Sequence, residues 1–271
     1  MTGFSADWLA LREPVDHASI NHTARERLRR YFADRQSIKI VDFGSGTGSN
    51  LRSLAPDIAA VQSWKLIDID QSLLQQVESR SSECLANSAD RVSFTSVTAD
   101  LSHADLLDII EGYDLVTASA LFDLVSRDVM DRIAQATATR GAAFYTTLIY
   151  DGIAAWIPAH PLDTQMRHAF NAHQKTDKGF GAAAGPDAAC ALTEAFASHG
   201  YTVTRGKSPW ILCSDVGRLR RETDRGWAGA AAETGSLAAE DIDGWLEHRL
   251  NAASAVTIVG HEDVLALPPR S

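Results

Sequence analysis

The feature that most constrains the fold is a glycine-rich turn between an apolar segment and a helix. The segment IKIVDF, residues 38–43, has the length and composition of a buried strand, and it ends abruptly at GSGTG. Residues 49–56 then have the pattern of a helix that Pro56 stops. Glycine lets a backbone turn tightly and approach a ligand closely, because it has no Cβ. This strand–turn–helix unit predicts an α/β fold with a ligand at the turn.

Further apolar segments of strand length follow this unit, and segments with helical spacing of apolar residues separate them. The expected strands cover residues 64–70, 91–100, 113–121 and 142–150, and a last strand is expected at 255–260. Such alternation predicts βαβ units and a mostly parallel sheet with helices on both faces. Ligands are expected at the carboxyl ends of the strands.

The alternation breaks after the fifth expected strand. Residues 151–186 contain three histidines and several glycines and are too long for a plain connection, so we expect a lid or substrate segment there. A helical insertion is expected at residues 215–250, before the last strand. We therefore expect one domain over residues 1–271, with a cofactor-binding half at 38–150.

Acidic residues end the second and third expected strands. Asp68 follows Gly48 by twenty residues, a position from which a carboxylate can accept hydrogen bonds from ribose hydroxyls. Asp70 is the alternative, although the phase of the next helix favours Asp68. Asp100 suits an adenine amino group, and Leu101 beside it is placed to cover the ring.

Asp42 lies inside the first apolar strand, two residues before the first glycine. A lone buried carboxylate is costly, so we expect it to meet loop N–H groups or a cationic ligand. A nicotinamide dinucleotide site needs the spacing G-x-G-x-x-G, whereas this chain has G-x-G-x-G followed by Ser49. The spacing and the acid favour a ligand with an ammonium group over a pyrophosphate. A dinucleotide-dependent oxidoreductase remains an alternative.

The segments DFGSGTG, LIDID, TADL and DLVTASAL together resemble the class I S-adenosylmethionine-dependent methyltransferases. The acid-x-Gly-x-Gly-x-Gly signature of that family is matched by Asp42, Gly44, Gly46 and Gly48. The resemblance covers residues 38–150 well and the remainder loosely. It implies a Rossmann-like sheet of seven strands, the last antiparallel. It also implies S-adenosylmethionine as cofactor and S-adenosylhomocysteine as product.

The resemblance also implies residue roles: Asp68 holds the ribose, Asp100 holds the adenine, and Ser119 and Ala120 line the floor beside the methyl donor. Arg12 is added as a partner for the methionine carboxylate, provided that the N-terminal segment folds over the site. The expected cofactor-binding residues are Asp42, Gly44, Ser45, Gly46, Gly48, Asp68, Ile69, Asp100, Leu101, Ser119, Ala120 and Arg12.

Methyl transfer requires alignment of donor and acceptor, exclusion of water and, for some acceptors, a general base. We expect His173, in the glycine-rich polar segment NAHQKTDKGFG, and Tyr150 as catalytic residues. Trp156, His160 and Lys178 are expected to bind the acceptor. No metal is expected, because no Asp-Asn pair follows the fifth strand. SALF stands where enzymes that methylate DNA bases have an Asn/Asp-Pro-Pro-aromatic motif, which disfavours base methylation.

The charge and the apolar runs of the chain limit the classes of partner that we expect for the protein. The chain of 271 residues has 25 basic and 35 acidic residues and a net charge of −10, which disfavours nucleic acid. No apolar run reaches the length of a membrane span, and no signal-peptide pattern is seen, so we expect a cytoplasmic monomer or homodimer. The three cysteines are expected to be reduced and mostly buried.

We expect a small-molecule acceptor. A non-catalytic S-adenosylmethionine-binding protein remains an alternative, which an acceptor pocket sealed by apolar side chains would favour.

Overall fold

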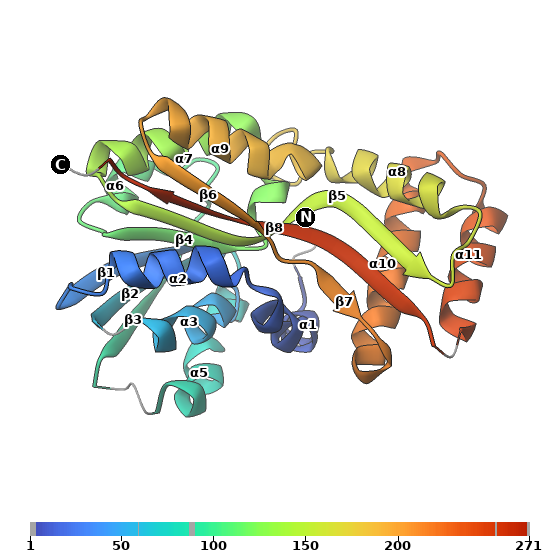
Figure 1. Ribbon diagram of the computed structural model, residues 1–271, viewed down its shortest axis with the longest axis horizontal. Coiled ribbons are helices and arrows are strands. Elements are labelled where there is room, and N and C mark those ends of the chain that lie inside the picture. Colours follow the sequence, from blue (N-terminus) through green and yellow to red (C-terminus); the bar gives the residue numbers. More distant parts are fainter. Residues whose placement is uncertain (1–3, 59, 87–89, 253, 270–271) are drawn as a thin grey trace.

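The computed structural model describes residues 4–58, 60–86, 90–252 and 254–269, which form a single mixed sheet flanked by helices (Figure 1). The order of its strands is β3-β2-β1-β4-β5-β8-β6, and β7 pairs with β8. Strands β1 to β5 are parallel to one another, whereas β8 is antiparallel to β5, β6 and β7. The predicted Rossmann-like fold is confirmed, and the short β7 is an addition to the seven strands expected. The strands are β1 (Ser37–Phe43), β2 (Val61–Asp68), β3 (Val92–Thr98), β4 (Leu115–Ser119), β5 (Ala143–Ile157), β6 (Thr202–Lys207), β7 (Trp210–Leu212) and β8 (Val256–Leu267).

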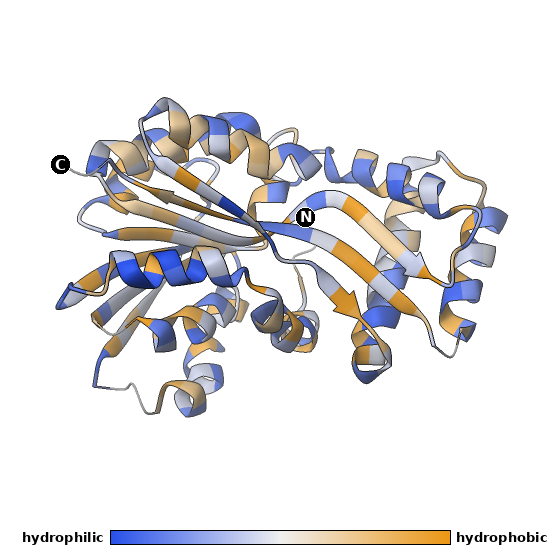
Figure 2. Ribbon diagram, viewed as in Figure 1, coloured by the Kyte–Doolittle hydropathy of each residue, from blue (hydrophilic) through white to orange (hydrophobic). Residues whose placement is uncertain are grey.

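Helices cover both faces of the sheet, and the strands between them are largely hydrophobic (Figure 2). On one face, one buried cluster joins β1, β4 and β5 to three helices, α6 (Leu106–Ile110), α7 (Arg127–Arg140) and α9 (Ala188–Ser198). On the other face, a second cluster joins the sheet to α2 (His22–Tyr31), α3 (Ser49–Leu54) and α5 (Val77–Leu85). The short α4 (Gln71–Leu74) follows β2, and α1 (Ala6–Ser19) precedes the sheet.

Strands β5 and β8 continue together past the end of the parallel sheet (Figure 1). There, Ala154–Ile157 pair with Val256–Val259, and β7 pairs with the other side of β8. The helices α8 (Asp163–Gln174), α10 (Gly217–Thr234) and α11 (Ala239–Asn251) cover this part through a third buried cluster, which is rich in tryptophan. We call this part the extension; it comprises residues 151–174, 210–251 and 256–260.

The extension corrects two strand boundaries. The predictions that the fifth strand ends at Tyr150 and that the last strand covers only 255–260 are wrong, because both strands are much longer. The pairing of β5 with β8 shifts register between Tyr150 and Ala154, and Gly152 there has a φ of 82°. This irregularity interrupts the apolar alternation without ending the strand. The predicted helical insertion before the last strand is confirmed as α10 and α11.

The prediction of mostly buried thiols is wrong, because Cys84 and Cys190 are exposed and Cys213 is half-buried. Among the residues that the structure describes, no helix combines the length and the apolar character that crossing a membrane requires.

Asp263, on β8, binds donors from three separate segments of the chain. Its buried carboxylate accepts hydrogen bonds from the backbone N–H of Leu148 at 2.9 Å, from Ser208 Oγ at 2.6 Å and from the backbone N–H of Asn21 at 2.7 Å. Leu148 lies at the first register shift of β5 and has a φ of 58°. One carboxylate thus holds the irregular point of β5, the start of α2 and the connection from β6 to β7.

We predict that Asp263→Ala lowers the free energy of unfolding by about 3 kcal/mol, because three donors lose a buried acceptor. Urea unfolding followed by circular dichroism measures this change. Asp243→Ala is the matched control, since Asp243 is exposed on α11. A loss below about 0.5 kcal/mol in Asp263→Ala would contradict the role given to this carboxylate.

Candidate functional site

The glycine turn joins the end of β1 to the start of α3. Gly44, Gly46 and Gly48 all have left-handed backbone angles, with φ of 62°, 52° and 81°. At Gly48 a Cβ would also lie 3.0 Å from Val77 Cγ1, so a side chain there is excluded by both conformation and space. The turn is attached to β2, because the Ser45 N–H donates to the Ile67 carbonyl at 3.0 Å and the Gly46 N–H to Asp68 Oδ2 at 2.8 Å.

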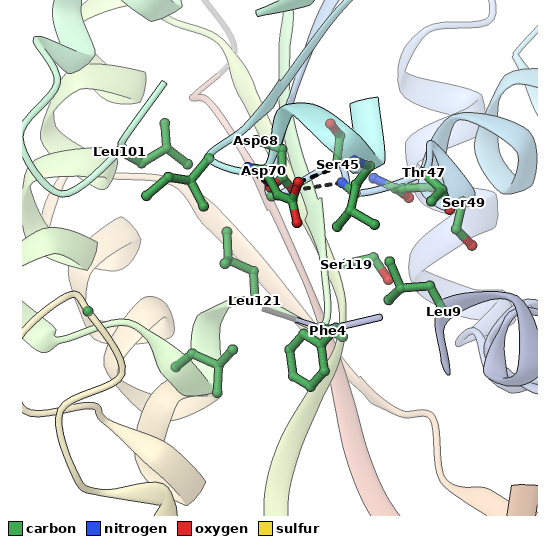
Figure 3. A pocket seen from close by; sticks show the side chains of 18 of the residues that line it. Phe4, Leu9, Ser45, Thr47, Ser49, Asp68, Asp70, Leu101, Ser119 and Leu121 are labelled. Atoms are coloured by element: carbon green, nitrogen blue, oxygen red, sulfur yellow. Dashed lines mark hydrogen bonds between the residues drawn. The ribbon is translucent and has the colours of Figure 1, made fainter. Parts of the chain in front are cut away.

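A cavity of about 1160 Å³ opens at the carboxyl ends of the parallel strands, where the fold class leads one to expect a ligand (Figure 3). It is lined by Phe4 and α1, by the glycine turn and the start of α3, by the ends of β2, β3 and β4 with residues that follow them, and by the loop 177–180. The predicted cofactor residues that line it are Gly44, Ser45, Gly46, Asp68, Ile69, Asp100, Leu101, Ser119, Ala120 and Arg12. Asp42 and Gly48 lie behind the cavity wall and do not line it.

The two carboxylates at the end of β2 have different partners. Asp68 uses both oxygens on backbone N–H groups, because Oδ1 accepts from Asp70 and Oδ2 from Gly46. Asp70 caps α4 by accepting from the Ser72 N–H and hydroxyl. Both residues line the cavity, and Figure 3 shows them beside each other. Asp68 is the one that binds the glycine turn itself, so a ligand held by Asp68 also contacts the turn.

The end of β3 supplies a carboxylate next to apolar side chains. Asp100 is exposed, and the hydrogen bond from the Ser102 hydroxyl holds the pKa of its carboxyl below the usual range. Leu101 beside it is buried, whereas the side chain of Ile69 is 68% exposed. An exposed isoleucine at a cavity rim is unfavourable in water and indicates an apolar face that a flat ligand can cover.

Asp42 is completely buried behind the glycine turn. Its Oδ1 accepts from Asn50 Nδ2 at 2.7 Å, and the same amide lies 3.1 Å from Thr117 Oγ1. Its Oδ2 has no hydrogen-bond partner among the described residues. Of the two kinds of partner expected for Asp42, loop N–H groups and a cationic ligand, the structure shows no loop N–H group among the described residues, and a side-chain amide from α3 binds Asp42 instead. Burial raises the pKa of the Asp42 carboxyl to about 7.

This raised pKa makes the stability of the ligand-free protein depend on pH. Between about pH 4 and pH 7, native Asp42 holds a proton that the unfolded chain releases, so stability falls as pH rises through this window. We predict that Asp42→Asn removes this fall. The free energy of unfolding of the variant minus that of the parent should therefore be at least about 1 kcal/mol larger at pH 8 than at pH 5. Urea unfolding of both proteins at the two pH values measures it. An equal difference at both values would contradict the assigned pKa.

The end of β4 forms the floor of the cavity. The Ser119 hydroxyl lies 3.0 Å from Thr147 Oγ1, and the Ala120 N–H donates to the Thr147 carbonyl at 2.9 Å. Ala120 has a left-handed φ of 52°, which is uncommon for a residue with a Cβ. The small side chain at this strained position leaves the floor open beside Ser119.

The helix α1 forms the side of the cavity opposite the loop 177–180. It is attached to α3, because Arg52 binds the Glu13 carboxylate and His17 Nε2 lies 3.0 Å from Ser49 Oγ. Arg12 and Asp16 line the cavity from this helix. Helix α1 was not among the helices predicted from the sequence, and Pro14 lies inside it. Its signals were the N-cap Ser5 and the i,i+4 pair of Arg12 with Asp16.

The residues predicted to act on the acceptor are not all close to the cavity. Lys178 lines it, and its Nζ lies 3.2 Å from Nε2 of His173, which in turn contacts Glu233 Oε2 at 2.9 Å. His173 itself does not line the cavity. Tyr150 is buried and donates to Asn171 Oδ1 at 2.7 Å, and burial raises the pKa of its hydroxyl.

Trp156 and His160 lie in the extension, away from the cavity. Trp156 packs edge-on against Trp227 and Trp245 in the third buried cluster. The ring of His160 lies 5.0 Å from that of His248 on α11. Neither residue lines this cavity, because β5 continues to Ile157 and carries the following residues beyond the end of the parallel sheet.

Within residues 4–58, 60–86, 90–252 and 254–269, no group of three or more histidine, cysteine, aspartate or glutamate side chains is arranged to hold a metal ion. The polar groups of the cavity are aspartates, hydroxyls, side-chain and backbone amides and two cationic side chains, Arg12 and Lys178.

No family model and no curated protein matches the chain. Its fold matches solved structures. A methyltransferase from Geobacter sulfurreducens in complex with S-adenosyl-L-homocysteine has a TM-score of 0.50 and 15% identity, over 99% of this chain and 100% of that one. The cyclopropane synthase MmaA2 from Mycobacterium tuberculosis has a TM-score of 0.51 and 11% identity, over 97% and 94% of the two chains.

The phosphoethanolamine N-methyltransferase 2 of Haemonchus contortus, in complex with phosphomonomethylethanolamine and S-adenosylhomocysteine, has a TM-score of 0.50 and 12% identity. The match covers 99% of this chain and 59% of that one, so this chain spans less than two thirds of that protein. At these identities the comparisons show the fold alone, which this chain shares with these two methyltransferases and the cyclopropane synthase.

Proposed function

We propose that the protein binds S-adenosylmethionine in this cavity and transfers its methyl group to a small molecule. The observation that carries the proposal is the arrangement around the cavity mouth. One carboxylate at the end of β2 binds the glycine turn, and a second, at the end of β3, lies beside an uncovered apolar face. When bound, the donor supplies a sulfonium methyl group, and the protein supplies alignment and exclusion of water.

The cavity residues fit the parts of this donor. Asp68 accepts from the ribose hydroxyls, and Asp100 accepts from the adenine amino group. The adenine ring lies between Ile69 and Leu101. The glycine turn and Ser45 bind the amino-acid part with backbone groups, and Asp42 adds a buried negative charge behind the turn once it ionises. The exposed side chain of Ile69 is a feature that such a ligand would cover.

A dinucleotide is less compatible with the same site. A pyrophosphate binds over the N-terminus of the helix that follows the glycine turn. Here α1 crosses that position, since His17 lies 3.1 Å from the Ser49 carbonyl and Leu9 Cδ1 lies 3.2 Å from where a Cβ of Gly46 would be. This cover over the start of α3 favours a donor without phosphates.

The volume and lining of the cavity favour catalysis over binding alone. About 1160 Å³ exceeds the roughly 300–1,000 Å³ of common ligand pockets, so a second molecule has room. Polar groups remain at the acceptor end, where Ser119 and Lys178 line the wall. A protein that only binds the donor needs no such groups. The net charge of −10 and the aspartates around the mouth favour a small acceptor over nucleic acid.

The loop 177–180 closes the acceptor end and acts as the lid in this proposal. The Asp177 carboxylate fixes it by accepting from the N–H groups of Gly179 and Gly181. His173 and Glu233 hold Lys178 from behind, and partial burial lowers the pKa of its ammonium. In this proposal His173 is therefore a positioning residue for Lys178.

We predict that Lys178→Met slows methyl transfer by roughly tenfold or more, because a charge-assisted contact to the acceptor is lost. The rate of S-adenosylhomocysteine formation, with an acceptor found by screening small-molecule pools, measures this change. Donor affinity should stay within about twofold of the parent. Lys175→Met is the matched control, since Lys175 in the same segment pairs with Asp187 instead. An unchanged rate in Lys178→Met would remove Lys178 from the acceptor site.

The cofactor assignment is tested by calorimetric titration with S-adenosylmethionine, S-adenosylhomocysteine and NADH in parallel. We expect the first two to bind and the third not to bind. Asp68→Asn should weaken S-adenosylhomocysteine by roughly tenfold or more, because a ribose hydroxyl loses a charged acceptor. Asparagine is preferred to alanine because it keeps an oxygen for the Gly46 N–H.

The matched control for that titration is Asp34→Asn, an exposed aspartate after α2. Binding of NADH alone would overturn the proposed donor. Unchanged affinity in Asp68→Asn, together with binding by the parent, would keep the donor and overturn the ribose site.

A further inference from the structure

The guanidinium of Arg12 is fixed on two sides before any ligand is present. Its Nε donates to Asp16 Oδ2 at 2.8 Å and its Nη2 to Asp16 Oδ1 at 3.3 Å. The plane of Trp210 lies beneath it, with Cζ 4.8 Å from the ring centroid. Trp210 Nε1 also donates to Asp16 Oδ1 at 3.0 Å, so the three side chains form one closed unit.

This unit leaves one end of the guanidinium available. Arg12 and Asp16 are only 9% and 7% exposed, and both line the cavity. Nη1 of Arg12 makes no hydrogen bond with the described residues, and it is not enclosed. A buried arginine is costly unless it is paired, and Asp16 meets that need on one edge. The remaining N–H groups can donate to an anion without breaking the pair.

The position of Arg12 places this free edge near the glycine turn. Three residues before Arg12 on α1, Leu9 lies over Gly46, and five residues after it, His17 contacts Ser49. Gly44, Asn50 and Ala120 share the cavity wall with Arg12. The adenine end, at Ile69 and Asp100, is lined by other segments. Arg12 therefore faces the end of the cavity that the amino-acid part of the donor would occupy.

We infer that Asp16 and Trp210 are positioning residues that hold Arg12 ready for the carboxylate of the donor's amino-acid part. This inference rests on the proposed function and adds two residues that do not touch the donor themselves. It also gives β7 a role, because Trp210 comes from that three-residue strand, which pairs with β8 in the extension. The first helix and the extension, far apart in sequence, thus meet at one donor group.

The test uses two ligands that differ by the carboxylate alone: S-adenosylhomocysteine and its decarboxylated form, S-adenosyl-3-thiopropylamine. Calorimetry on the full-length parent and variants gives the ratio of their affinities. The parent should prefer S-adenosylhomocysteine. Arg12→Met should reduce this preference by about 10- to 100-fold, and Asp16→Asn and Trp210→Phe should each reduce it by at least threefold. Affinity for the decarboxylated ligand should stay within about twofold of the parent.

Two controls separate positioning from general damage to the fold. Trp227→Phe removes a buried indole that stacks on Phe170 outside the cavity, and it should leave the ratio unchanged. Asp16→Glu keeps a carboxylate on the same helix face and should restore part of the preference. If Asp16→Asn does not fold, Trp210→Phe carries the test, because it keeps an aromatic face but loses the N–H to Asp16.

The outcomes distinguish this inference from the proposed function. A parent that binds S-adenosylhomocysteine, with an unchanged ratio in Asp16→Asn or in Trp210→Phe, overturns the positioning role and leaves the donor site standing. An unchanged ratio in Arg12→Met assigns Arg12 to another ligand and overturns the inference as well. A parent that binds neither compound overturns the proposed function itself.

Discussion

The antiparallel pairing of β5 with β8 is the interaction on which the rest of the structure depends. At one end β5 is a parallel partner of β4 and carries Thr147, which holds the floor of the cavity. At the other end the same two strands form the base of the extension. Two register shifts separate the part of the strand pair at the cavity floor from the part in the extension. Asp263 lies at the first shift and satisfies the N–H of Leu148, so the fold places a buried carboxylate where the ladder is interrupted.

The aspartates at the ends of β2 and β3 already bind donors of the protein itself. Asp68 holds the glycine turn, Asp70 caps a helix and Asp100 caps its own turn, all through donors near in sequence or space. Asp42 is the exception, since one of its oxygens is buried without a partner. The two cations at the cavity wall, Arg12 and Lys178, lie on the segments that close it. The cations of the cavity wall thus lie on the covering segments, where each segment also carries an aspartate, Asp16 or Asp177.

The local signals in the sequence were enough to predict that the glycine turn and the acids at the strand ends lie around one cavity. The glycine turn and the acids at strand ends depend on neighbours within a few residues, and Gly44, Asp68 and Asp100 lie around one cavity as that pattern predicts. The covering segments were harder, because they depend on contacts distant in the chain. Helix α1 contains a proline, and its ion pairs are visible only once the helix is known. Trp156 and His160 were misplaced because an irregular strand was taken to end at Tyr150.

The central claim is that the cavity takes S-adenosylmethionine in one orientation, with the nucleoside at the ends of β2 and β3 and the amino-acid part beneath α1. A crystal structure of the complex with S-adenosylhomocysteine tests it most directly. We predict ribose hydroxyls on Asp68, adenine between Ile69 and Leu101, and the carboxylate on Arg12. A nucleoside bound elsewhere in the cavity, or an amino-acid part pointing to Lys178, would contradict the account.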